Sequence, residues 1–189
     1  MNGETGRQPC RSYFSHSSWQ LVEFMTPRPS GKPGAQDTTP ERRILFLDID
    51  GVMIPFGEKE ISRDCAENLR HIMKATGAGI VISSTWRAPP IERLLKVWRA
   101  AGLRESWILG GTPDLALSPD SRADRLRGME IQAWLTMNGA AGARFAIIDD
   151  QCDDITPCFP PHVVFTTKPE LGLTRQVADN VIHCLMLGR

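Results

Sequence analysis

Residues 44–53 read ILFLDIDGVM, and this stretch decides the fold. Its first four residues are apolar, as in a strand that is covered on both faces of a sheet. Asp48 and Asp50 follow two residues apart, and Gly51 comes directly after them. A buried strand that ends in two carboxylates requires something to compensate their charge.

Bulk composition excludes few function classes. The chain has 189 residues, of which 41% are apolar and 23% charged, as in an ordinary soluble domain. Lys plus Arg and Asp plus Glu are equal at 22 each, so net charge indicates neither a nucleic-acid nor a membrane partner. Five cysteines without a Cys-x-x-Cys motif are typical of a reducing compartment. No apolar run approaches the roughly 20 residues of a membrane span. We therefore expect a cytoplasmic protein.

Short apolar runs alternate with segments of helical period after residue 41. The predicted strands are 44–48, 79–84, 107–109, 144–149 and 162–165. The predicted helices are 64–75, 90–101, 128–137 and 174–187. This alternation predicts an α/β fold, a doubly wound, Rossmann-like parallel sheet of about five strands with flanking helices. Residues 1–40 are rich in Gly, Pro, Ser, Thr and Gln, which predicts a mostly disordered tail before a domain at 41–189.

Acidic residues end two of the predicted strands. Asp48 ends the first strand, and Asp149 and Asp150 end the fourth. If these strands are neighbours, the carboxylates meet at one sheet edge and raise each other's pKa unless a cation compensates. Oxygen ligands favour Mg²⁺, which in proteins usually takes a few carboxylates together with a phosphate. The cluster therefore predicts a Mg²⁺ site and a phosphorylated substrate.

Hydroxyls and arginines supply the matching phosphate contacts. The second strand ends in Ser83 and Ser84, whose hydroxyl and backbone N–H groups can bind phosphoryl oxygens. Arg87 could bind the same anion, or it could pack on Trp86 at the surface. Arg127 lies at a helix start, an unfavourable place for a cation unless its side chain reaches the acidic cluster.

This pattern resembles the haloacid dehalogenase-like (HAD) phosphohydrolase superfamily. The resemblance covers residues 42–187, and its motifs are LFLDIDGV, Ser83 in IVISS, Arg127, and the pair Asp149–Asp150. The segments SSTWR, RGMEIQAWL, IIDD and LGLT are similar to the HAD domain of Swiss Army knife RNA-repair proteins.

The resemblance implies a catalytic assignment. Asp48 would be the nucleophile that forms an aspartyl-phosphate. Asp50 would be the general acid and then the base, with its backbone carbonyl as a metal ligand. Ser83 would hold the phosphoryl group, and Arg127 would neutralise its charge. Asp150 would complete the Mg²⁺ ligands with Asp48 and Asp50.

The same resemblance implies roles for further residues around this catalytic set. Asp149 would orient Arg127 or lie in the second shell, and Asp154 (or its neighbour Asp153) would assist through water. Ser84 and Arg87 would bind substrate.

Members of the superfamily often carry a cap domain, for which this chain has little room. We expect no folded cap, only a flap near 52–62 and a loop near 110–126. An open site admits large substrates such as a nucleic-acid phosphate end, the substrate the resemblance implies, or a phosphoprotein. The arginines at 122–127 form either a solvated face or a nucleic-acid rim. The alternatives to a phosphatase are a non-catalytic binding or sensor module that keeps the Mg²⁺ and phosphate pocket, and a phospho-accepting receiver domain.

Overall fold

The structure, a computed structural model, describes residues 42–88, 90–116, 126–140 and 142–187. The tail predicted to be mostly disordered, at 1–40, lies outside these residues, so that prediction and the domain boundary after it stay predictions.

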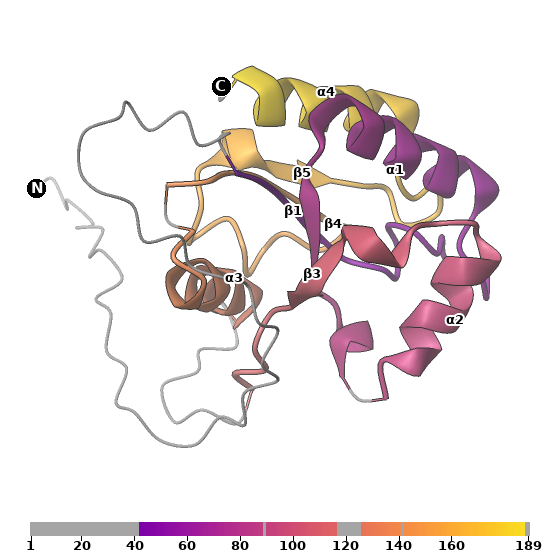
Figure 1. Cartoon of the computed structure of the whole chain (residues 1–189), viewed down its shortest axis with the longest axis horizontal. Coiled ribbons are helices and arrows are strands. Elements are labelled where there is room, and N and C mark those ends of the chain that lie inside the picture. Colours follow the sequence, from indigo (N-terminus) through magenta and orange to yellow (C-terminus); the bar gives the residue numbers. More distant parts are fainter. Residues whose placement is uncertain (1–41, 89, 117–125, 141, 188–189) are drawn as a thin grey trace, which may run out of the picture. The chain divides into compact units, whose positions relative to one another are not determined.

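Parallel strands form one sheet in the part of the chain that the structure describes (Figure 1). The five strands are β1 (Arg43–Leu47), β2 (Gly79–Ile82), β3 (Ile108–Gly111), β4 (Arg144–Asp149) and β5 (Val164–Thr166). Their order is β3-β2-β1-β4-β5, and every neighbouring pair is parallel. The predicted doubly wound sheet is therefore confirmed. Four of the five residues of β1 are buried, because β1 is the middle strand and is covered on both faces.

Four α-helices flank this sheet within the described residues. They are α1 (Arg63–Thr76), α2 (Glu92–Ala100), α3 (Leu126–Met137) and α4 (Arg175–Leu187). Figure 1 shows α1 and α4 side by side along one side of the sheet, with α3 on the other side. The ring of Phe46 in β1 meets Trp134 of α3 edge-to-face, with centroids 5.5 Å apart. This packing fixes α3 beneath the middle of the sheet.

Four of the five predicted strands have boundaries that shift by one or two residues in the structure. The strand expected at 162–165 starts at Val164, after a 3-10 turn over Pro161–Val163. Two adjacent prolines precede it, and because proline has no N–H it cannot donate to the sheet. The strand expected at 79–84 ends at Ile82, which leaves Ser83 and Ser84 beyond the sheet.

The described residues contain no folded cap domain. The segment expected to be a flap, 52–62, consists of turns, and its backbone is tied to a neighbouring loop. Leu173 donates to the Val52 carbonyl, and Phe56 donates to the Pro169 carbonyl, each at 2.8 Å. The loop expected at 110–126, like the arginine-rich stretch at its end, is described only in part. Among the described helices, none combines the length and the apolar character that a membrane span requires.

Candidate active site

Adjacent strands bring the predicted carboxylates together. Leu47 of β1 pairs with Ile148 of β4, so the next residues, Asp48 just after β1 and Asp149 at the end of β4, lie side by side. The Asp48 N–H donates to the Ile148 carbonyl at 3.0 Å and holds this register to the strand end. Both carboxylates are buried, at 6% and 3% exposure.

An acidic triad results, with geometry that fits a metal ion. One carboxylate oxygen from each of Asp48, Asp149 and Asp150 lies within 4.8 Å of the others. Within the described residues, Asp149 Oδ2 is buried and accepts no hydrogen bond, and it lies 3.9 Å from Arg127 Nη1. A set of carboxylate oxygens, one of them buried without a hydrogen bond, suits a hard divalent cation such as Mg²⁺.

Gly51 is required where the chain turns beside this triad. Its φ is +71°, a left-handed conformation, and an added Cβ would lie 2.6 Å from Asp150 Cγ. Only glycine allows both the turn and this close approach. The glycine after the two aspartates is thus explained by its close approach to Asp150, which follows β4.

The electrostatics of the triad favour a compensating cation. Burial raises the pKa of Asp48 to about 6, an effect that the nearby Arg127 guanidinium reduces. Burial and the neighbouring Asp48 charge raise the pKa of Asp149 to about 8. The pKa of Asp150 is also raised, chiefly by burial. Without a bound cation, the three carboxyl groups therefore do not all ionise at neutral pH.

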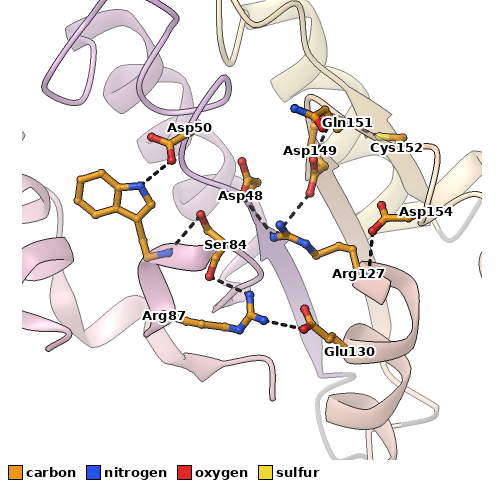
Figure 2. Close-up of polar contacts among 11 residues, drawn as sticks. Asp48, Asp50, Ser84, Arg87, Arg127, Glu130, Asp149, Gln151, Cys152 and Asp154 are labelled. Atoms are coloured by element: carbon orange, nitrogen blue, oxygen red, sulfur yellow. Dashed lines mark hydrogen bonds and ion pairs between the residues drawn. The ribbon is translucent and has the colours of Figure 1, made fainter. Parts of the chain in front are cut away.

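Arg127 reaches into the triad from the first turn of α3 (Figure 2). Its Nη1 is 3.3 Å from Asp48 Oδ1 and 3.9 Å from Asp149 Oδ2. Asp154 Oδ2 accepts the backbone N–H of Arg127 at 2.9 Å, so it caps this helix. Gly128 allows the first turn of α3 to pack closely against the loop that carries Asp154, because a Cβ at position 128 would lie 2.8 Å from the Asp154 carbonyl oxygen.

The two serines after β2 have different environments. Ser83 is fully buried, its Oγ has no hydrogen-bond partner among the described residues, and it does not line the cavity above the triad. Ser84 does line this cavity, and its hydroxyl hydrogen-bonds the Asp48 carboxylate. Ser84 thus lines the cavity and Ser83 does not, and which of the two contacts a phosphoryl group stays a prediction.

Arg87 has internal partners. Its Nη2 donates to Glu130 Oε1 at 2.7 Å, and its Nη1 donates to the Ser84 carbonyl at 2.9 Å. Glu130 is 2% exposed, and burial raises its pKa although Arg87 opposes the shift. Arg87 does not line the cavity. It ties the turn after β2 to α3, and its contact with substrate stays a prediction.

Asp50 lies at the exposed side of the site. Its Oδ2 accepts the indole N–H of Trp86 at 2.8 Å (Figure 2). The guanidinium of Arg93 lies over the Trp86 ring, 4.0 Å from the centroid. Arg93 therefore packs on the Trp86 ring, whereas the Arg87 side chain is only 12% exposed and pairs with Glu130.

A cavity of about 740 Å³ lies above these groups. Six aspartates and one arginine line it, together with Ser84, Thr85 and the exposed Phe56 at its edge. The buried Cys152 thiol also lines it, but burial raises the pKa of that thiol to about 11. A thiol with a raised pKa is mostly protonated at neutral pH, which disfavours Cys152 as a nucleophile.

Sequence reasoning did not find Glu130 and Trp86 as parts of the site. Glu130 lies three residues after Arg127, on the same face of a helix, which was a usable signal for a buried acid near the site. Trp86 gave no signal, because an aromatic residue before an arginine has no specific meaning in sequence.

Comparison with protein families gives a match over residues 44–178, to the HAD domain in Swiss Army knife RNA repair proteins. Searches of curated proteins and of solved structures found no match.

Proposed function

The chain belongs to the family of HAD domains found in Swiss Army knife RNA repair proteins, and we propose that it is a Mg²⁺-dependent phosphomonoesterase. The family supports a phosphohydrolase at the general level. One observation in particular supports the finer proposal. At the end of the middle strand, the buried Asp48 carboxylate interacts with an arginine and a serine hydroxyl, and a carboxylate oxygen of each of two further aspartates lies within 4.8 Å of it.

Asp48 has the surroundings of a nucleophile that attacks phosphorus. Arg127 and the Ser84 hydroxyl both contact its carboxylate, and both reduce its pKa against the effect of burial. The same two groups could bind the oxygens of a phosphoryl group that approaches Asp48. Attack by a carboxylate oxygen would then give an aspartyl-phosphate.

Asp50 is suited to the proton transfers. It lines the cavity, is exposed, and lies two residues after Asp48. It would give a proton to the leaving oxygen in the first step, and would take one from the hydrolytic water in the second.

The Asp48 and Asp150 carboxylates, with the Asp50 backbone carbonyl, would hold the metal ion. When bound, Mg²⁺ would supply positive charge that neutralises the phosphoryl oxygens and the carboxylates. Asp149 would hold Arg127, whose Nη1 lies 3.9 Å from Asp149 Oδ2.

The proposed substrate is the phosphate end of a nucleic acid. Two features favour it, the RNA-repair family and a cavity without a folded cap over it in the described residues. An exposed Phe56 at the cavity edge offers a surface on which a base could stack. A panel of nucleotides, phosphorylated sugars, and RNA and DNA with 3′- or 5′-phosphates would test this by phosphate release. Cleavage of small sugars or nucleotides alone would reject the nucleic-acid substrate.

The activity itself is tested with p-nitrophenyl phosphate, with and without Mg²⁺. We expect turnover that needs Mg²⁺ and falls by at least about a thousandfold in Asp48→Asn, which removes the nucleophile. Asp179→Asn, on the exposed face of α4, is the matched control and should keep full activity. Absence of turnover with retained Mg²⁺ binding would instead favour the binding or sensor module.

A further inference from the structure

A hydrogen bond joins Trp86 to Asp50. The indole N–H donates to Asp50 Oδ2 at 2.8 Å, from a turn that follows a different strand. We propose that Trp86 is a positioning residue, which holds the Asp50 carboxylate in the orientation needed for proton transfer to the leaving group. This inference rests on the proposed phosphatase function.

The Trp86 side chain is itself held in place from several sides. Its backbone N–H donates to Ser84 Oγ, which caps the short turn Thr85–Arg87. The next residue, Arg87, fastens the same turn to Glu130 of α3. Arg93 of α2 covers one face of the indole through a cation–π contact. The N–H therefore points to Asp50 from a rigid support.

Asp50 needs such support more than the other acids of the site do. Asp48 and Asp149 are buried and packed, whereas Asp50 is exposed. An exposed side chain is free to change rotamer, and fixing it costs conformational entropy. The Trp86 hydrogen bond restricts this freedom by holding Oδ2.

The proton follows a balanced path in this arrangement. As Asp48 attacks, the bond from phosphorus to the leaving oxygen breaks, and that oxygen keeps the electron pair and takes the proton from Asp50. The alcohol leaves, and Asp50 is then a carboxylate. It takes a proton from the water that attacks the aspartyl-phosphate, which releases phosphate and restores both aspartates.

A purely structural contact would have a different consequence. An exposed hydrogen bond contributes little to folding, because water can replace either partner. Loss of the N–H would then affect all substrates equally or not at all. A positioning role predicts a loss that depends on the leaving group, because a poor leaving group needs protonation and p-nitrophenolate does not.

The test compares the wild-type protein with Trp86→Phe on two substrates, p-nitrophenyl phosphate and an alkyl phosphate such as glycerol 2-phosphate. Phenylalanine keeps an aromatic ring under Arg93 and removes the N–H. We expect kcat/KM, which reports the steps up to the aspartyl-phosphate, to fall about tenfold or more for the alkyl ester and to change less than about twofold for the nitrophenyl ester. Trp107→Phe, before β3, is the matched control and should leave both activities unchanged.

A double-mutant cycle with Asp50→Asn separates this role from general effects. If Trp86 acts through Asp50, Trp86→Phe should cause no further loss in the Asp50→Asn protein. If Trp86→Phe does not fold, Arg93→Ala takes its place, since Arg93 is exposed and its loss only frees the indole. We expect Arg93→Ala to show the same dependence on leaving group with a smaller loss.

The outcomes are distinguishable. Equal losses on both esters, or an additive loss in the Asp50→Asn protein, would overturn the role of Trp86 while the phosphatase function stands. A wild-type protein that cleaves neither ester with Mg²⁺ would overturn the proposed function, and this inference with it.

Discussion

Asp154 caps the helix that carries Arg127, although the two residues are 27 positions apart. The carboxylate accepts the first-turn backbone N–H at 2.9 Å, and the side chain of the same arginine reaches Asp48. The loop after β4 therefore positions the Arg127 guanidinium beside Asp48, the proposed nucleophile.

Substitution of Asp154 should separate its charge from its capping function. Asp154→Ala should lower stability by about 1 kcal/mol, as loss of a cap does, and should lower kcat because Arg127 moves. Asp154→Asn keeps an acceptor oxygen and should retain most of the stability and most of kcat. Urea unfolding and p-nitrophenyl phosphate turnover measure the two effects. Equal losses in Ala and Asn would show that the charge, and not the cap, matters.

Alanine substitutions at Gly51 and Gly77 form a matched pair that tests the turn beside the acidic triad. Both have positive φ, +71° and +62°, so alanine is strained at either position. An added Cβ at Gly51 meets Asp150, whereas one at Gly77 meets nothing within 4 Å. Both Ala variants should lose about 1 kcal/mol, but only Gly51→Ala should also lose Mg²⁺ affinity and turnover. Isothermal titration with Mg²⁺ checks this, and normal metal binding in Gly51→Ala would contradict it.

Substitution of one partner of the buried Arg87–Glu130 pair should strongly lower the free energy of unfolding. The side chains are 12% and 2% exposed, so Glu130→Gln leaves a buried arginine without its counter-charge. We expect a loss of about 3 kcal/mol in the free energy of unfolding. The double variant Arg87→Met with Glu130→Met should be more stable than Glu130→Gln, because it removes both charges. Chemical denaturation measures all three proteins, and equal stability of the single variant and wild type would refute the prediction.

The metal-free protein should become less stable as pH rises. The folded protein raises the pKa of Asp48 to about 6 and of Asp149 to about 8, above the ordinary value of 3.8. It therefore holds protons that the unfolded chain has released, and this stabilisation is lost between about pH 4 and pH 8. Mg²⁺ binds the ionised carboxylates, so the rise in Tm on its addition should be larger at about pH 8 than at about pH 5.

Thermal unfolding with EDTA or Mg²⁺ across this pH range measures the effect. Asp149→Asn, which removes the group with the higher pKa, should flatten the pH dependence above about pH 6. A Tm of the metal-free wild type that rises across this interval would contradict the electrostatic account.

The sequence predicts the sheet and the meeting of the acids for one physical reason. Parallel strands end at one edge, so apolar runs that finish in Asp48 and in Asp149–Asp150 place those residues together once β1 and β4 are neighbours. The apolar runs are readable because these strands are buried on both faces.

Details that depend on loop conformation could not be read in the same way. Whether Ser83 or Ser84 faces the cavity depends on where β2 ends, and the strand pattern is least informative at its ends. The Trp86–Asp50 and Asp154–Arg127 contacts join loops that are distant in sequence. These contacts arise from the tertiary structure, and no local periodicity in the sequence predicts them.

The most direct test of the account is to locate the phosphoryl group on the enzyme. Wild-type protein is mixed with a phosphate monoester and Mg²⁺, quenched in acid within one turnover, digested, and analysed by mass spectrometry. We predict an acid-stable, hydroxylamine-sensitive phosphoryl group on Asp48, which is absent in Asp48→Asn. Turnover with no phosphorylated Asp48, or with the phosphoryl group on another residue, would contradict the central claim that Asp48 is the nucleophile.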